Sequence, residues 1–242
     1  MPAARRLLRS HQLLITCEHG GNHVPARYRA AFAGAEGALE SHRGYDPGAL
    51  ELARQFARTL RAPLIYSTTS RLLIELNRAL GHRQSFSPYA LRLPARTRVE
   101  LVRRYYAPYR AAVAGQVARA ASRGRRLVHL SCHSFTPRLA GVLRTADVGL
   151  LFDPRRGAEA RFCTSWQASL RAREPRLRVR RNYPYRGAAD GLTTELRRRW
   201  PDAAYIGIEL EVNQKFPKGD TARWRELRAL LIGSFAEALR AA

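Results

Sequence analysis

Short apolar runs alternate along the chain with longer segments in which apolar residues recur every three or four positions. The short runs predict β-strands at 13–17, 63–67, 127–132, 147–152 and 205–213. Helical spacing predicts α-helices that end near residue 60 and that cover about 97–122, 157–171, 193–199 and 221–241. Strands that alternate with helices are typical of a mainly parallel sheet covered on both faces. The pattern therefore predicts an α/β fold, a three-layer α/β/α sandwich formed as one domain over residues 1–242.

Local signals refine the ends of these elements. Asp46 precedes Pro47, which predicts a helix N-cap followed by proline at the first helical position. Pro108 predicts a kink in the helix over 97–122. Residues 79–96 combine glycine, proline and polar residues, so they predict a loop before that helix.

Composition narrows the class of protein. The hydrophobic fraction of 45% is enough for a sizeable core, and no apolar stretch approaches the roughly 18 residues of a membrane span. The basic N-terminus has no apolar region before the first strand, which predicts a cytoplasmic protein. Cys17, Cys132 and Cys163 are odd in number and show no paired spacing, which argues against a disulfide framework.

The net charge of +24 raises the hypothesis of a nucleic-acid-binding protein. Only Lys215 and Lys218 among the 43 basic residues are lysines, and the arginines are scattered along most of the predicted helices. This scatter favours a solvated surface over a nucleic-acid-binding patch. The positive electrostatic potential of such a surface would still attract an anionic small-molecule substrate.

Two histidines follow strand-like runs and precede turn residues. His19 follows the run at 13–17, and His133 follows the run at 127–132. Ligands of open α/β sheets bind outside the carboxyl ends of the strands. Both histidines can be core residues satisfied by backbone partners, but together they favour two ligands of one metal ion.

A third ligand is needed for such a site. Asp46 is the preferred candidate, and Glu18 and His23 remain alternatives. Two histidines and a carboxylate leave a fourth position for water, which is the arrangement of a hydrolytic zinc centre. The pattern therefore predicts one Zn²⁺ ion.

The strand at 205–213 carries two carboxylates on one face. Glu209 and Glu211 share a face with Asn213, while the other face is apolar. Burying unpaired carboxylates is costly, so each is expected either to pair with an arginine or to act as a general base. The spacing alone leaves these alternatives open.

Several polar residues are candidates for substrate binding. Arginine can bind a substrate carboxylate through two parallel N–H groups. The candidates for contact with such a carboxylate are Arg71, Asn77, Arg78 and Arg144. Asn182 and Tyr185 lie in a polar stretch between predicted elements, where binding groups often occur.

Seven segments in the same order give the chain a family resemblance. They are 17–25 (CEHGGNHVP), 46–49 (DPGA), 70–78 (SRLLIELNR), 133–137 (HSFTP), 147–154 (DVGLLFDP), 182–187 (NYPYRG) and 208–214 (IELEVNQ). In this order they resemble N-formylglutamate amidohydrolases over about residues 12–240. That family is similar in fold to zinc-dependent exopeptidases and muramoyl amidases, which implies a mixed sheet.

The resemblance also implies a reaction. It is hydrolysis of N-formyl-L-glutamate to formate and glutamate, a step of histidine catabolism. By position, His19, His133 and Asp46 match the metal ligands, and Glu211 matches the base, with Glu209 in reserve. A zinc peptidase or a cell-wall-type amidase is the alternative among enzymes. The oligomeric state is left open.

Overall fold

The computed structural model describes residues 11–241 and contains one six-stranded sheet. In spatial order the strands are β2 (Leu64–Tyr66), β1 (His11–Cys17), β3 (Arg126–Phe135), β8 (Tyr205–Asn213), β6 (Val148–Leu151) and β7 (Val179–Arg181). Neighbouring strands are parallel except β6 and β8, which are antiparallel. The predicted α/β fold with a mainly parallel, mixed sheet is therefore confirmed.

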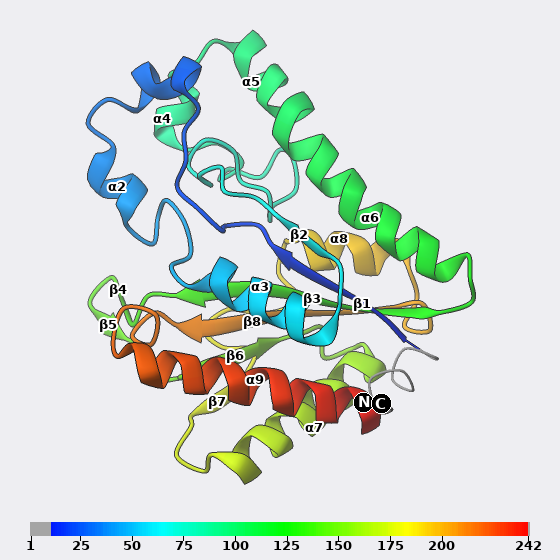
Figure 1. The fold of residues 1–242 in the computed structure, drawn as a ribbon. Helices are drawn as coiled ribbons and strands as arrows, with labels where there is room; N and C mark the ends of the chain where they lie inside the picture. The colour runs from blue at the N-terminus through cyan, green and yellow to red at the C-terminus, as the bar shows by residue number, and fades with distance from the viewer. Residues whose placement is uncertain (1–10, 242) are drawn as a thin grey trace.

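Helices cover both faces of this sheet. α3 (Ala49–Leu60), α7 (Gly157–Arg173) and α9 (Thr221–Ala241) pack on one face. The short 3₁₀ helix η1 (Ala26–Phe32), α6 (Ala107–Ala121) and α8 (Leu192–Arg199) pack on the other. Figure 1 shows α7 and α9 on one side of the strands and α6 and α8 on the opposite side. Together they make the three layers that the alternation predicts.

The two faces of the central strands differ in character. On the α3–α7–α9 face the side chains of β8 are apolar, as the alternation in 205–213 predicts, and those of β3 are apolar as far as Cys132. On the opposite face, the amino ends carry Leu14, Leu127 and Tyr205. Farther along the strands that face becomes polar, and Ser131 and His133 are both buried there. A polar site therefore lies at the carboxyl edge of one face.

The helix predicted over 97–122 has three parts. α5 (Ala95–Leu101) continues through a π-helical segment, η2 (Val102–Tyr106), into α6. Pro108 lacks an N–H and its ring crowds the carbonyl four residues earlier, which accounts for the widened turn just before it. The predicted loop over 79–96 also contains α4 (Pro88–Leu91) and the start of α5, so that boundary is wrong by several residues.

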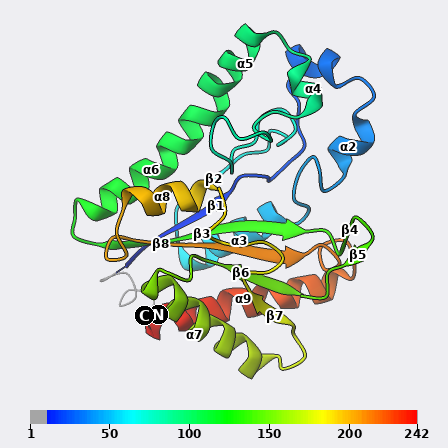
Figure 2. The same cartoon turned by 180° about the vertical axis from the view of Figure 1, so that it is seen from behind.

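Besides η1 and α4, four short elements were not predicted. They are α2 (Glu36–Glu40), the edge strand β7, and a hairpin of β4 (Arg138–Leu139) and β5 (Val142–Leu143). β7 has only three residues, two of them exposed arginines, so no apolar alternation marks it. Figure 2 shows the hairpin beyond the carboxyl ends of β3 and β8. Elements this short bury too little surface to leave a periodic signal.

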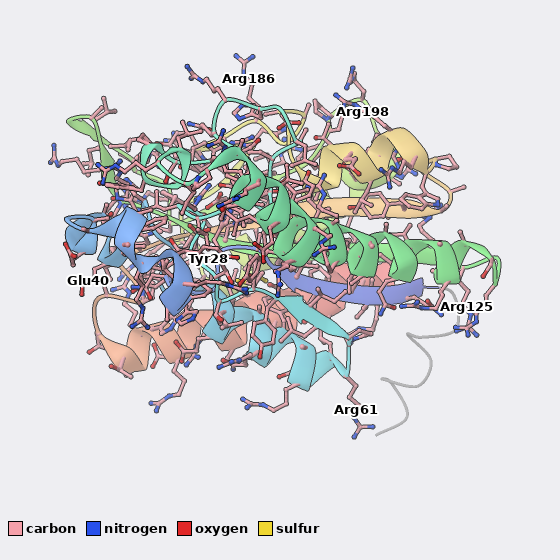
Figure 3. All side chains as sticks on the ribbon, turned by 90° about the horizontal axis from the view of Figure 1, so that it is seen from above. Tyr28, Glu40, Arg61, Arg125, Arg186 and Arg198 are labelled. Carbon is pink, nitrogen blue, oxygen red and sulfur yellow. The ribbon has the colours of Figure 1, made fainter. Side chains whose placement is uncertain are left out.

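The surface is consistent with dispersed positive charge. Arg61, Arg186 and Arg198 project outward from different parts of the ribbon in Figure 3. All three cysteines are free and buried, as expected. Among the helices of residues 11–241, none combines the length and apolarity that crossing a membrane requires.

Candidate metal centre

His19 lies two residues beyond β1, where the chain turns beside the segment that follows β2. The N–H of Gly20 donates to the Ser67 carbonyl at 3.0 Å. A Cβ atom on Gly20 would stand 2.8 Å from that carbonyl oxygen, and one on Gly21 would stand 2.7 Å from the oxygen of Thr68. The two glycines therefore permit this close backbone approach, which fixes His19 at the carboxyl edge of the sheet.

Asp46 faces the site instead of capping a helix, so the predicted N-cap is wrong. α3 begins at Ala49, after Gly48 with φ of 79°, and no side chain caps it. A Cβ on Gly48 would collide with Pro217, so this left-handed glycine lets the chain pass Pro217 before the helix begins. The N–H of Asp46 donates to the His19 carbonyl at 2.9 Å, which holds the carboxylate beside that histidine.

His133 lies within β3 and has two important neighbours. β3 extends to Phe135, beyond the predicted end at 132. In the sheet register His133 pairs with Glu211 of β8. The rings of His133 and His19 lie 5.0 Å apart between centroids. Residues from three separate segments of the chain thus meet at one buried point.

Three ligand atoms converge there. Oδ2 of Asp46 lies 3.2 Å from Nδ1 of His19 and 2.9 Å from Nδ1 of His133. One ligand atom from each residue lies within 4.8 Å of the others, and all three residues are buried. Ligand atoms about 2.0–2.2 Å from a tetrahedral ion are roughly 3.3–3.6 Å apart. The donor set therefore suits a metal ion such as zinc, and the two distances to Oδ2 of Asp46 are slightly shorter than that spacing.

The two alternatives for the third ligand are placed differently. His23 is exposed. Glu18 is buried but lies on the far side of the His133 ring, 3.1 Å from Nε2. Its carboxylate accepts hydrogen bonds from the hydroxyls of Ser131 at 2.5 Å and Tyr109 at 2.8 Å. Asp46 alone of the three lies beside both Nδ1 atoms.

Opposite charges hold the carboxylates of this cluster in the ionised state. Burial by itself raises the pKa of Asp46, but the charge of His19 and the contact with His133 outweigh it and lower this pKa well below its usual range. Burial likewise opposes the low pKa of Glu75, which the charges of Arg71 and His19 produce. The result is a cluster of anionic groups arranged around two imidazoles.

Glu211 behaves differently from these carboxylates. It is buried, and its Oε2 atom has no hydrogen-bond partner in the part of the chain that the structure describes. Burial raises the pKa of Glu211 to about 8, and the positive charge of His133 only partly opposes this. A raised pKa in a carboxyl beside convergent ligands is typical of a functional site.

Glu209 has a different environment although it shares the face of Glu211. It pairs with Ser131 in the register, two residues before the His133–Glu211 pair. Its Oε1 accepts a hydrogen bond from the Thr193 hydroxyl at 2.6 Å. Glu209 therefore anchors the start of α8, farther from the ligands.

Comparison of the whole sequence with known families identifies the family. The family model for N-formylglutamate amidohydrolase matches residues 11–216, most of the chain. The chain belongs to this family. No curated protein sequence matches it.

Two solved structures share the fold. The gene product Atu2144 from Agrobacterium tumefaciens is 27% identical, with a TM-score of 0.81 over 95% of this chain and 91% of that one. An N-formylglutamate amidohydrolase from Ralstonia eutropha is 18% identical, with a TM-score of 0.72 over 96% of this chain and 94% of that one. The second likeness shows the fold alone, because its identity is low.

In this member of the N-formylglutamate amidohydrolase family, Arg71 contacts the metal-site carboxylates. Its NH1 donates to Oδ1 of Asp46 at 3.3 Å, and its Nε donates to Oε2 of Glu75 at 2.9 Å. The side chain keeps 27% of its surface exposed. Its predicted role in binding a substrate carboxylate stays a prediction.

Arg144 and Tyr185 form a second pair near the site. NH1 of Arg144 donates to the Tyr185 hydroxyl at 3.0 Å, and the guanidinium lies 5.0 Å from the centre of that ring. Burial and the charge of Glu211 raise the pKa of Tyr185, which places this phenol within electrostatic reach of the proposed base. The structure thus brings these two substrate-binding candidates together.

Three other candidates bind backbone groups of neighbouring loops. Oδ1 of Asn77 accepts from the N–H of Leu192 at 2.9 Å, and Arg78 donates to the Asp190 carbonyl. Oδ1 of Asn182 accepts from the N–H of Phe152 at 3.0 Å. These contacts fix the loops around the site, and a direct contact with substrate stays a prediction.

Glu75 is the functional candidate that the sequence reasoning missed. Its Oε1 lies 2.5 Å from Nε2 of His19. The available signal was Arg71, four residues earlier in the same segment, because a half-buried arginine there favours a nearby carboxylate partner. The partner histidine is 56 positions away in sequence, so no local pattern links it to Glu75.

The surroundings of His42 indicate a cationic rim. Burial and the charges of Lys218, Arg144 and Arg71 lower the pKa of His42. Pro217 contacts Gly48, which brings the loop of Lys218 against the segment that carries Asp46. Positive side chains from three segments therefore lie within electrostatic reach of His42, and one of them, Arg71, contacts Asp46.

Proposed function

We propose that this chain is a zinc-dependent amidohydrolase that cleaves the amide of an N-acyl amino acid. N-formyl-L-glutamate is the preferred substrate, and formate and glutamate are the products. The observation that carries the proposal is the buried group of His19, Asp46 and His133 beside the unpartnered carboxyl of Glu211. Membership of the N-formylglutamate amidohydrolase family supports the choice of substrate.

Each part of this cluster has a chemical task. Zinc held by His19, Asp46 and His133 would supply a Lewis acid that polarises the amide carbonyl. Glu211 provides the proton transfers, because its free Oε2 can take a proton from the attacking water. The same carboxyl then gives that proton to the amine nitrogen, which must be protonated to leave.

The pKa of Glu211 bears on this role. At about 8 it keeps the carboxyl protonated at neutral pH. Additional positive charge at the neighbouring ligands favours the carboxylate and lowers this pKa. We therefore expect Glu211 to be in its base form at neutral pH only after zinc has been loaded.

The charges around the site support an anionic substrate. Arg144 and Lys218 have no acidic partner among residues 11–241, and both act on His42. A cationic rim raises the local concentration of anions. Arg144 also presents a planar fork, which suits a carboxylate.

The test combines metal content with a substrate comparison. Purified protein is expected to take up one zinc per chain and to hydrolyse N-formyl-L-glutamate. It should hydrolyse N-formyl-L-glutamine more slowly, because that substrate has lost its side-chain carboxylate and offers only the α-carboxylate to the cationic rim. Formate release measures both reactions, and a His133→Gln variant is the control for contaminating hydrolase.

Other outcomes would replace the proposal. Cleavage of peptides or cell-wall fragments without deformylation would favour a zinc peptidase or a cell-wall-type amidase. Tight, strongly salt-dependent binding of DNA or RNA by metal-free protein, with no hydrolase activity, would favour a nucleic-acid-binding protein.

A further inference from the structure

Both candidate metal histidines have a carboxylate on each ring nitrogen. For His19, Asp46 lies at Nδ1 and Glu75 lies at Nε2, at 3.2 and 2.5 Å. For His133, Asp46 lies 2.9 Å from Nδ1 and Glu18 lies 3.1 Å from Nε2. One carboxylate is shared by the two Nδ1 atoms, whereas each Nε2 atom has a carboxylate of its own.

We propose that Glu75 and Glu18 are positioning residues that direct Nδ1 of both histidines to the metal. A neutral imidazole carries its proton on one nitrogen, and a carboxylate acceptor beside Nε2 keeps the proton there. Nδ1 then keeps its lone pair for the ion. This proposal rests on the proposed zinc binding.

Arg71 connects the two sides of this arrangement. It donates to Oδ1 of Asp46 and to Oε2 of Glu75. The remaining oxygens, Oδ2 of Asp46 and Oε1 of Glu75, are those that face His19. Arg71 therefore fixes the ligand carboxylate and the orienting carboxylate relative to each other.

Glu18 is fixed in an equivalent way by neutral groups. The Tyr109 hydroxyl binds one of its oxygens, and the Ser131 hydroxyl binds the other. The Ser131 oxygen also lies 2.8 Å from Nε2 of His133. Both orienting carboxylates are thus held by other side chains, Glu75 by Arg71 and Glu18 by Tyr109 and Ser131.

Zinc affinity is the first test. Glu75→Gln keeps the shape of the side chain and removes its charge, and loss of such an outer partner typically weakens metal binding about 10–100-fold. Glu195→Gln is the matched control, because Glu195 also pairs with a buried arginine, Arg110, but does not touch a histidine. Competition titration with a zinc-binding dye gives the dissociation constants.

Histidine tautomers are the second test, and they need neither zinc nor turnover. Nitrogen-15 NMR of metal-free wild-type protein, at a pH high enough for the His19 ring to be neutral, is expected to show its remaining proton on Nε2. Glu75→Gln is expected to populate the other tautomer more, whereas Glu195→Gln should leave the spectrum unchanged. A wild-type His19 with its proton on Nδ1 would overturn the proposal.

Arg71→Lys separates positioning from substrate binding. Lysine has one charged centre and cannot bridge both carboxylates, so the positioning role predicts a fall in zinc affinity for Arg71→Lys. A raised KM with unchanged zinc affinity would assign Arg71 to the substrate.

Failure of this proposal differs from failure of the proposed function. Normal zinc affinity in Glu75→Gln, in a protein that binds zinc and deformylates its substrate, would overturn only the positioning role. A wild-type protein that binds no zinc would overturn both.

Discussion

His129 and His133 lie on the same face of β3, four residues apart, and both are buried. Each ring nitrogen of His129 has a hydroxyl partner, since Thr16 Oγ1 and Tyr205 Oη each lie 2.8 Å from one of these nitrogens. Burial lowers the pKa of His129 to about 4. Burial also opposes protonation of His133, but Asp46 and Glu18 raise its pKa well above the usual value.

The difference comes from position along the strand. At His129 the neighbours are the adjacent strands β1 and β8, which supply Thr16 and Tyr205. At His133 the strands are near their carboxyl ends, and the loop that carries Asp46 returns beside the sheet. Residue type alone thus does not separate a structural histidine from a metal ligand, whereas access to returning loops does.

The largest expected effect tests the contrast between His129 and His133 directly. His133→Gln should abolish zinc binding and activity, because a neutral amide replaces one of three ligands. His129→Gln should keep one zinc per chain, because its side chain contacts no ligand. Metal analysis after gel filtration decides, and equal zinc content in the two variants would contradict the assignment.

The same contrast extends to the two carboxylates of β8. Glu211→Gln should lower kcat about 10²–10⁴-fold with zinc content unchanged, since it removes the general base. Glu209→Gln should have a smaller effect, because Glu209 is bound to Thr193. Steady-state kinetics on N-formyl-L-glutamate test this. A large loss only in Glu209→Gln would transfer the role to that residue.

The pH dependence of stability tests the environment of His129. The folded pKa of His129, about 4, lies below the unfolded value of about 6.5. Between these values the unfolded chain binds more protons, so this contribution is complete above pH 6.5 and is lost as pH falls toward 4. As the pH falls through this window, the unfolding free energy of the wild-type protein should drop by about 3 kcal/mol more than that of His129→Gln.

Urea unfolding of metal-free protein at pH 7 and pH 4.5 measures that difference. Carboxylates common to both proteins cancel when the two changes are subtracted. Parallel pH profiles for wild type and His129→Gln would show that His129 does not resist protonation in the folded state.

The smallest expected effect concerns the hydroxyl partner of His129. Tyr205→Phe removes one hydrogen bond from a buried ring nitrogen and should cost about 1–3 kcal/mol of unfolding free energy. Zinc affinity should be unchanged, because Tyr205 lies at the amino end of β8. Denaturant titration and zinc competition together check this, and a weakened zinc site would show that the two ends of the sheet are coupled.

Much of the fold could be predicted from the sequence because the spacing of apolar residues indicates which side chains are buried. The alternation in 205–213 predicted β8 with correct ends, and the helical spacing over 221–241 predicted α9. The boundaries that failed are those set by distant contacts. Asp46 precedes a proline like an N-cap, but the packing of Gly48 on Pro217 moves the helix start to Ala49.

From the sequence, His19 and His133 could be nominated by their places after strand-like runs, and Asp46 and Glu211 by the motifs that carry the family resemblance. How these residues are connected depends on the packing of the folded chain. Glu75 meets His19 across 56 positions, and Asp46 meets His133 across 87. Local patterns report whether a side chain is buried, whereas the partner that satisfies a buried charge depends on how separate segments pack.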